Sequence, residues 1–348
     1  MALIYLFKMK KIFLFLVLLL TLSACSTNDY EPIVYENPEI AFDIPDRFPQ
    51  PNSSIYTNKP TKYGVKLGKL LFNDKRFSAN NSISCASCHI QSNAFADTNI
   101  QAIGIEGRIG LRNTPPIQNL AFMKFYNWDG SKLNLESQPI VPIVTHEEMD
   151  SSILEVIGKI KDDLQYKELF KKAFGDKNIT AERIYRSIVQ YEYTLISANS
   201  KYDRVMRNKS ETFTESEVKG YEIFQQKCAN CHSGELFTDQ SFRNIGFPVN
   251  MNTNEAGRAR VTGKSEDFMS FRVPSLRNVE HTAPYGSFGQ FATLKEVLDY
   301  FDIGVLSSDN LDPIFKENGN RIPLTEDEKE YLIAFMKTLS DNEFTGRN

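Results

Sequence analysis

One short motif occurs twice in this sequence and constrains it more than any other feature. Both copies read Cys-x-x-Cys-His, and together they use four of the five cysteines and two of the four histidines. This spacing lets two thiols add to the vinyl groups of a haem while the next imidazole reaches the iron, so each copy is typical of c-type haem attachment. A single Cys-x-x-Cys can instead be half of a zinc site or a redox disulfide, but two complete copies favour two covalent haems. The residues are Cys85, Cys88 and His89 in the first motif and Cys228, Cys231 and His232 in the second.

The start of the chain has the form of an export signal. Three lysines precede an apolar run from Ile12 to Leu22, which is too short to be a spanning helix. The segment that ends at Cys25 is similar to a bacterial lipoprotein box, which predicts cleavage before Cys25 and a lipid on its thiol. Ordinary secretory cleavage near the same place is the alternative. We therefore expect a signal peptide over residues 1–24 and a periplasmic protein whose only membrane contact is the lipid anchor at Cys25.

Length and charge narrow the classes of protein that fit. A chain of 348 residues has room for about two domains. Its net charge of -4, its isoelectric point near 5.8 and the lack of a long basic stripe argue against nucleic-acid binding. Residues 25–58 are polar and rich in proline, so we expect a tether and an extended lead-in there.

Helical signals outnumber strand signals in the remainder of the chain. Thr214 with Glu217, and Thr325 with Glu328, form capping boxes that each open an amphipathic helix. A third amphipathic pattern runs over residues 184–195. The sequence therefore predicts a mainly α fold.

Several landmarks recur in the same order in the two halves, which indicates an internal duplication. We expect two cytochrome c-like haem domains, over residues 59–205 and 206–348. The matched pairs are Gly68-x-x-x-Phe72 with Gly220-x-x-x-Phe224, Phe95-Ala96-Asp97 with Phe237-Thr238-Asp239, and Pro115 to Asn119 with Pro274 to Asn278.

Six segments between residues 60 and 340 resemble the bacterial di-haem cytochrome c peroxidase family, including its MauG branch. The resemblance implies that the first-domain haem is the peroxide site and that the second receives electrons from a small donor protein, a cytochrome c or a cupredoxin. It also allows for a homodimer. The segments are Leu67 to Phe72, Ser84 to His89, Arg112 to Pro115, Trp128 to Gly130, Val273 to Asn278 and Thr282 to Tyr285.

The resemblance also implies roles for three side chains near the peroxide. The family places a tryptophan between the haems, a glutamine ten residues later and a glutamate after ten more, which here are Trp128, Gln138 and Glu148. A carboxylate suits proton transfer between the two peroxide oxygens, and shelter from water would raise its pKa from about 4.3 toward neutrality. Taken alone, Glu147 and Glu148 could equally form a solvated acidic turn, and His146 beside them is a second candidate iron ligand.

Calcium is a further expectation from the resemblance. The family binds this ion between its domains through an asparagine side chain and backbone oxygens. The matching residues are Asn113, Thr282 and Pro284, and an oxygen-rich set of this kind suits a hard cation.

Three positions depart from the family pattern. Ile105 stands where other members have a histidine that covers the first iron, so we predict a first haem that needs no reductive activation. Phe301 stands where the second haem usually has a methionine or tyrosine ligand, and Ser287 replaces a usual histidine. Reduction of hydrogen peroxide is thus the leading prediction, and the alternatives are a MauG-like oxidase acting on a protein or small molecule, or a non-enzymatic electron carrier.

Overall fold

The structure is a computed structural model, and it describes residues 36–207, 211–249 and 255–347. The predicted signal peptide and Cys25 lie outside these residues. The described residues from Asn37 onward form one compact unit by their contacts. The division at residue 205 into two haem domains therefore stays a prediction.

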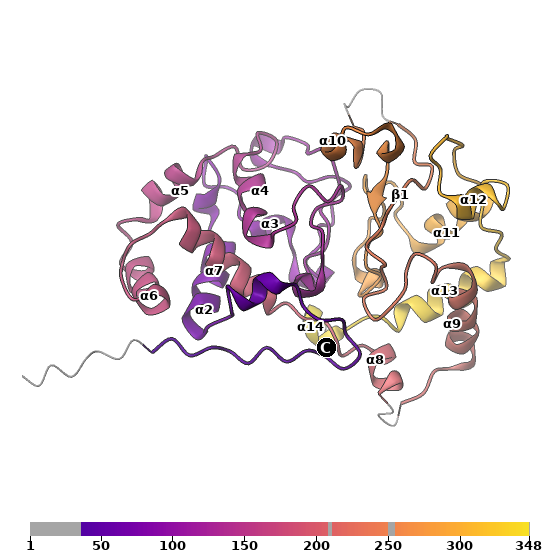
Figure 1. Cartoon of the computed structure of the whole chain (residues 1–348), viewed down its shortest axis with the longest axis horizontal. Coiled ribbons are helices and arrows are strands. Elements are labelled where there is room, and N and C mark those ends of the chain that lie inside the picture. Colours follow the sequence, from indigo (N-terminus) through magenta and orange to yellow (C-terminus); the bar gives the residue numbers. More distant parts are fainter. Residues whose placement is uncertain (1–35, 208–210, 250–254, 348) are drawn as a thin grey trace, which may run out of the picture. The chain divides into compact units, whose positions relative to one another are not determined.

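Helices make up most of the regular structure, as predicted, and Figure 1 shows two groups of them. The first group contains α2 (Lys62–Phe72), α3 (Cys85–Cys88), α4 (Ile140–Val144), α5 (Ile153–Ile160), α6 (Leu164–Phe174) and α7 (Ala181–Tyr193). After α8 (Lys201–Met206), the second group contains α9 (Glu215–Lys227), α10 (Ala259–Thr262), α11 (Leu294–Ile303), α12 (Pro313–Lys316) and α13 (Glu326–Lys337), followed by the short α14 (Asn342–Thr345). Strands β1 (Phe242–Arg243) and β2 (Phe271–Arg272) pair antiparallel, with Phe242 opposite Arg272.

The predicted helix starts are confirmed. At α9 the Thr214 side chain accepts a hydrogen bond from the Glu217 amide, and the Glu217 carboxylate accepts one from the Thr214 amide. The same reciprocal pair, Thr325 with Glu328, opens α13. The third predicted helix is α7. These caps satisfy backbone donors that the first helical turn leaves free, so they fix where each helix begins.

A closely packed helix pair forms the core of each group. Gly68 on α2 lies against the backbone of Ser187 on α7, and Gly220 on α9 lies against the backbone of Tyr331 on α13. Each glycine stands four residues before a buried phenylalanine, Phe72 or Phe224. The two halves thus share this packing, although their origin by duplication stays a prediction.

We expect the substitutions Gly68→Ala and Gly220→Ala to destabilise the protein. A Cβ at either position would overlap a backbone carbonyl oxygen of the facing helix, which cannot move without separating the pair. The cost of such overpacking is about 1–3 kcal/mol in the free energy of unfolding, measurable by chemical denaturation. Gly158→Ala on α5 is the control, because nothing lies within 4 Å of its added Cβ and alanine favours helix. Equal stability of all three variants would contradict the prediction.

Segments far from the haem motifs in the sequence pack against the body of the protein. The described part of the lead-in is not a free tether, since Ile55 is buried and the Asn37 side chain donates to the carbonyl oxygen of Ala173 at 2.9 Å. At the other end, the ring of Phe344 on α14 lies 5.5 Å from the ring of Phe95, which follows the first motif. Both contacts tie the chain ends to the first group of helices.

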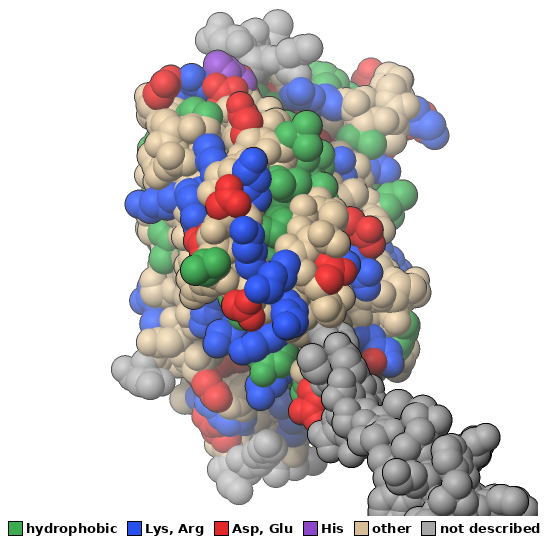
Figure 2. Space-filling model, turned by 90° about the vertical axis from the view of Figure 1, so that its left-hand side faces the viewer, with side chains coloured by type: hydrophobic (Ala, Val, Ile, Leu, Met, Phe, Trp, Pro, Cys, Tyr) green, Lys and Arg blue, Asp and Glu red, His purple; other side chains and the backbone are tan. Residues whose placement is uncertain are grey.

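The surface of the first group carries charges of both signs. Figure 2 shows Lys and Arg side chains along the middle of this face with Asp and Glu side chains between them. Within the described ranges, no helix has both the length and the apolar character needed to cross a membrane.

Candidate active site

The first motif forms a short helix whose histidine is held by the following loop. α3 spans the two cysteines, and both carry free thiols. His89 Nδ1 lies 2.8 Å from the carbonyl oxygen of Phe95. A histidine that donates through Nδ1 keeps Nε2 free to bind a metal. Burial lowers the pKa of His89, which favours the neutral imidazole that iron binds.

The second motif repeats this local geometry. His232 Nδ1 lies 3.0 Å from the carbonyl oxygen of Phe237, and burial lowers the pKa of this histidine too. Phe95 and Phe237 have φ angles of 60° and 51°, a left-handed backbone that is uncommon outside glycine. The same turn therefore presents a carbonyl oxygen to the histidine of each motif.

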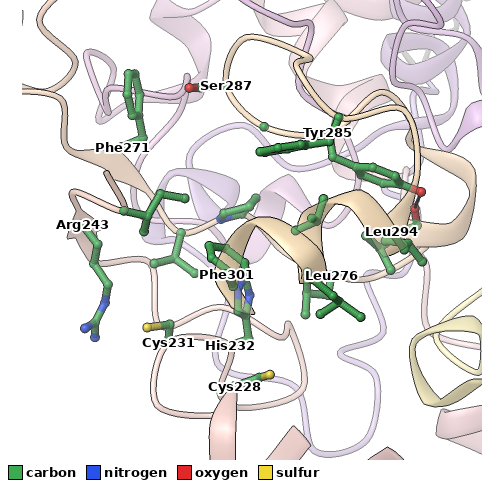
Figure 3. Close-up of a pocket in the computed structure, with 18 of the residues that line it drawn as sticks. Cys228, Cys231, His232, Arg243, Phe271, Leu276, Tyr285, Ser287, Leu294 and Phe301 are labelled. Atoms are coloured by element: carbon green, nitrogen blue, oxygen red, sulfur yellow. Dashed lines mark hydrogen bonds between the residues drawn. The ribbon is translucent and has the colours of Figure 1, made fainter. Parts of the chain in front are cut away.

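The second motif opens into a cavity whose residues fit a haem. Figure 3 shows Cys228, Cys231 and His232 at one side of it, below the helix α11 that carries Phe301. Most of the other lining side chains are apolar, among them Phe247, Leu276, Phe291, Leu294, Leu298 and Ile322.

Arg272 supplies the complementary charge in this cavity. It is buried, and its side chain donates to backbone carbonyl oxygens of Asn127 and Val273 at 3.5 and 3.3 Å. Burial lowers its pKa to about 10. A buried cation without a carboxylate partner among the described residues is costly unless an anion lies beside it. A haem propionate meets that need, so the chemistry of the lining fits the cofactor.

Glu148 lies close to the first motif and is sheltered from water. Burial, followed by the charge of Glu147, raises its pKa. Burial, together with the negative charges of Asp97 and Glu148, raises the pKa of Cys88 to about 12. The Glu148 carboxylate is therefore close enough to the first motif to act on it electrostatically. Glu147 is exposed and Glu148 is half-buried, so the two neighbours differ in environment and do not form a uniformly solvated turn.

The Ile105 loop fixes the backbone of Glu148. The Ile105 amide donates to the Glu148 carbonyl oxygen at 2.8 Å, and the Ile105 side chain is buried. Gly104 is needed for this contact, because a Cβ there would overlap the carbonyl oxygen of Glu147. The residue that replaces the family histidine thus packs next to the predicted acid–base group.

Gln138 and Trp128 are linked through Asn127. Gln138 follows the short 3₁₀ helix η6 (Leu135–Ser137), and its Nε2 lies 3.4 Å from Asn127 Oδ1. Trp128 is buried, lines the second cavity and donates from Nε1 to the carbonyl oxygen of Asn113 at 2.8 Å. Its segment therefore connects the neighbourhood of Gln138 with the cavity of the second motif.

A buried ion cluster holds the turn that contains Trp128. Arg112 donates to the Asp129 carboxylate at 2.8 Å and to both carboxylate oxygens of Glu255 at 2.7 and 2.9 Å. Arg258 donates to the carbonyl oxygen of Gly130 at 2.9 Å. The cluster joins both halves of the chain around the tryptophan and restricts its orientation.

The residues predicted to bind calcium all line the second cavity. These are Asn113, Thr282 and Pro284. The Asn113 amide nitrogen donates to the carbonyl oxygens of Asn99 and Ile100, both at 3.1 Å. The described residues contain no group of three or more His, Cys, Asp or Glu side chains placed to hold a metal ion. Since the predicted site uses amide and backbone oxygens, calcium stays a prediction.

The contacts of His146 lie at the surface of the protein. Its side chain is 64% exposed and its Nδ1 lies 3.2 Å from the Asp150 carboxylate. Arg108 donates to the same nitrogen at 3.0 Å. The histidine is therefore engaged at the surface.

Two buried charged residues near the motifs were not predicted from the sequence. One is Arg272, described above, and the other is Glu192. Glu192 on α7 is buried, burial raises its pKa to about 8, and its Oε2 has no hydrogen-bond partner among the described residues. Its charge also acts on the Cys85 thiol, which places it beside the first motif. Its sequence neighbours, Gln190 to Tyr193, give only the pattern of an amphipathic helix.

Together, the paired motifs, their histidine geometry and the mainly helical fold define a c-type di-haem protein. A family model described as di-haem cytochrome c peroxidase matches residues 62–211. The methylamine utilization protein MauG of Methylophilus methylotrophus is 30% identical over 87% of this chain and 88% of its own length. The cytochrome c551 peroxidase of Nitrosomonas europaea is 33% identical over 80% of each chain. The chain belongs to the di-haem cytochrome c peroxidase family, whose members carry two haem c groups.

Two further matches agree with the fold and the predicted anchor. The crystal structure of a MauG-like protein associated with microbial copper homeostasis superimposes with a TM-score of 0.78 and 28% identity, over 88% of this chain and 97% of that chain. A model of the prokaryotic membrane lipoprotein lipid attachment site matches residues 9–26, which include Cys25.

Proposed function

We propose that this protein reduces hydrogen peroxide to water at the haem held by Cys85, Cys88 and His89. Electrons come from a small redox protein, a cytochrome c or a cupredoxin, through the haem held by Cys228, Cys231 and His232. The observation that carries this proposal is Glu148, a sheltered carboxyl group of raised pKa beside the first motif.

A haem at this motif would supply an iron that binds peroxide and passes to it two electrons from the donor protein. Glu148 would accept the proton of the peroxide oxygen nearer the iron and give it to the far oxygen, which leaves as water, while the near oxygen leaves as a second water with two protons taken from solvent. Gln138, whose amide is held by Asn127, donates a hydrogen bond to the bound peroxide and keeps the far oxygen within reach of Glu148. Burial of Glu148 serves this cycle because a raised pKa makes the ionised carboxylate a stronger proton acceptor than an exposed one.

Trp128 is proposed as the electron relay between the two haems. It lines the second cavity, and the Arg112 cluster holds its turn in place. Its Nε1 hydrogen bond to Asn113 fixes the indole plane. Electrons would therefore pass through one buried aromatic ring that is held by a hydrogen bond and by the packing of its turn.

A MauG-like oxidase is the second candidate function. It is favoured by Phe301, which lines the second cavity where peroxidases of the family have a methionine, and the similar proteins include both kinds. A protein or small-molecule substrate would then be oxidised, with electrons moving from the substrate inward through Trp128 to the haems and peroxide as the final acceptor. Peroxide reduction without any organic substrate, driven by a reduced donor protein, distinguishes the peroxidase from this oxidase.

The cellular setting follows from the same proposal. We infer a periplasmic protein anchored through lipid on Cys25, with two duplicated haem domains over residues 59–205 and 206–348. The proposal also includes a calcium ion at Asn113, Thr282 and Pro284 and a homodimer.

Mixing the protein as isolated with hydrogen peroxide and a reduced cytochrome c tests the activity. Donor oxidation without prior reduction of the protein is expected, because Ile105 cannot cover the first iron. Turnover that starts only after the protein has first been reduced, or no turnover at all, would contradict the peroxidase proposal.

The pH dependence of peroxide reduction should report the environment of Glu148. Glu148 must be ionised to accept a proton, so the rate falls as the pH drops through its raised pKa. Glu147→Gln removes the second cause of that raised pKa and leaves burial unchanged, so the acid limb of the pH–rate profile should move to lower pH. Glu222→Gln, an exposed site on α9, is the matched control. Coincident acid limbs in Glu147→Gln and the wild type would contradict the assignment.

A further inference from the structure

Two apolar clusters, which share Ile322, line the cavity of the second motif. One surrounds the α9 and α13 pair and includes Phe224, Leu332 and Met336. Cys228 and Ala229 also pack against this cluster, so it adjoins the segment that carries His232. The other cluster contains Phe301 with Ile245, Ile314, Phe315 and Ile322, and the rings of Phe301 and Phe315 lie 5.6 Å apart.

The Phe301 cluster offers no atom that can bind iron. Its members that line the cavity carry only hydrocarbon side chains. Tyr300 also packs against this cluster, but its hydroxyl donates to the carbonyl oxygen of Gly246 at 2.6 Å. Tyr300 therefore points to the backbone of another segment, and the adjacent phenylalanine is the residue that faces the cavity.

Of the other lining residues with a ligand atom, Lys227 and Tyr285 have partners, and Ser287 offers only a neutral hydroxyl, which is buried and has no hydrogen-bond partner among the described residues. Lys227 donates to the carbonyl oxygen of Pro323 at 2.8 Å and to the carboxylate of Glu328 at 2.7 Å. Tyr285 donates to the carbonyl oxygen of Val279 at 2.9 Å. Met336 is buried on α13 in the cluster that also contains Cys228 and Ala229, away from the Phe301 cluster. Among the described lining residues, His232 carries the imidazole suited to bind the iron, and the Phe301 cluster supplies no ligand.

We propose that the second haem iron has no protein ligand on the Phe301 side and that this side binds a small, uncharged diatomic molecule. The Phe301 cluster itself offers no hydrogen bond or counter-charge to offset the desolvation of a charged ligand, and the Arg272 cation in the same cavity is assigned to a haem propionate. The rings of Phe301 and Phe315, 5.6 Å apart, occupy this part of the cavity and favour a small ligand. The proposal depends on haem attachment at Cys228 and Cys231 but not on peroxide reduction, so either can fail without the other.

Carbon monoxide binding to the fully reduced holoprotein tests this site. The number of carbon monoxide molecules bound per chain is counted by optical titration in the wild type, in Phe301→Met and in the control Phe301→Leu. We expect two per chain in the wild type and in Phe301→Leu, and the loss of one in Phe301→Met, because a thioether at this position can occupy the iron. Ferric spin states from electron paramagnetic resonance should change in parallel, with one haem converted from high spin to low spin in Phe301→Met.

The outcomes separate the two haems. One carbon monoxide in the wild type and none in Phe301→Met would still support the proposal, and would show that the first iron is covered. One carbon monoxide per chain in both the wild type and Phe301→Met, or none in the wild type, would overturn the proposal. A low-spin second haem in the wild type that Phe301→Leu leaves unchanged would also overturn it, because another protein ligand would then occupy the site. Haem content per chain, measured for each variant, verifies that both haems are attached.

Discussion

Replacing Glu148 by glutamine should slow the reaction of the protein with hydrogen peroxide by about 10²–10⁴-fold. The amide keeps the size of the side chain but cannot accept the peroxide proton. Since burial raises the pKa of Glu148, the neutral amide also resembles the protonated form and should leave the fold intact. Stopped-flow absorbance after mixing with peroxide measures the rate directly.

Two comparisons make this test specific. Glu147→Gln changes the exposed neighbour and should keep most of the rate at neutral pH. Glu148→Asp retains a carboxylate and should keep more activity than Glu148→Gln, though less than the wild type, because the shorter side chain retracts from the peroxide. Equal rates for Glu148→Gln and the wild type would remove Glu148 from the mechanism and favour the electron-carrier alternative.

Loss of the Arg277 side chain should cost about 3–5 kcal/mol in the free energy of unfolding. Arg277 is fully buried and makes two hydrogen bonds of 2.9 Å to the carboxylate of Asp203, which is itself buried. In Arg277→Met that carboxylate remains buried without its partner. Chemical denaturation of the holoprotein measures the loss.

The pH dependence of this loss identifies its cause. Burial raises the pKa of Asp203, but the hydrogen bonds and charge of Arg277, together with the hydrogen bonds from Ser200, outweigh it, so the pKa is lowered in the folded protein. Without Arg277, only the Ser200 hydrogen bonds oppose burial, so the pKa of Asp203 in the folded state rises and the carboxyl group takes up a proton more readily as the pH falls. The stability deficit of Arg277→Met should therefore shrink as the pH falls.

An exposed ion pair provides the matched control for Arg277. Lys177 and Glu168 are both about half exposed, and Lys177→Met should change stability by less than about 1 kcal/mol. A similar small effect for Arg277→Met would show that the buried pair contributes little. The double variant Arg277→Met with Asp203→Asn should recover part of the loss.

The features that could be predicted from the sequence are those that residues close together in the chain determine. The haem motifs are contiguous because one haem must meet both thiols and the imidazole, and the capping boxes act within a single helical turn. Glu148 was reached through family spacing, and the structure supplies a physical basis for it in burial and the Ile105 contact.

The features that were missed depend on distant segments. Arg272 looks like an ordinary strand residue until the fold places it beside Asn127 and the second cavity. Glu192 occupies one turn of an amphipathic helix, where a glutamate normally faces water, and only the packing around α7 buries it. Neither position has a local pattern, because their burial arises from residues far away in the chain.

The contacts of α14 bear on when the loop after the first haem motif takes its final form. The side chain of Gln91, just after His89, donates to the carbonyl oxygen of Phe344, 253 positions later in the chain. This contact can form only once those later residues have folded against the loop. Haem attachment to the first motif before that step would leave the C-terminal segment to cover a loop that already carries its cofactor.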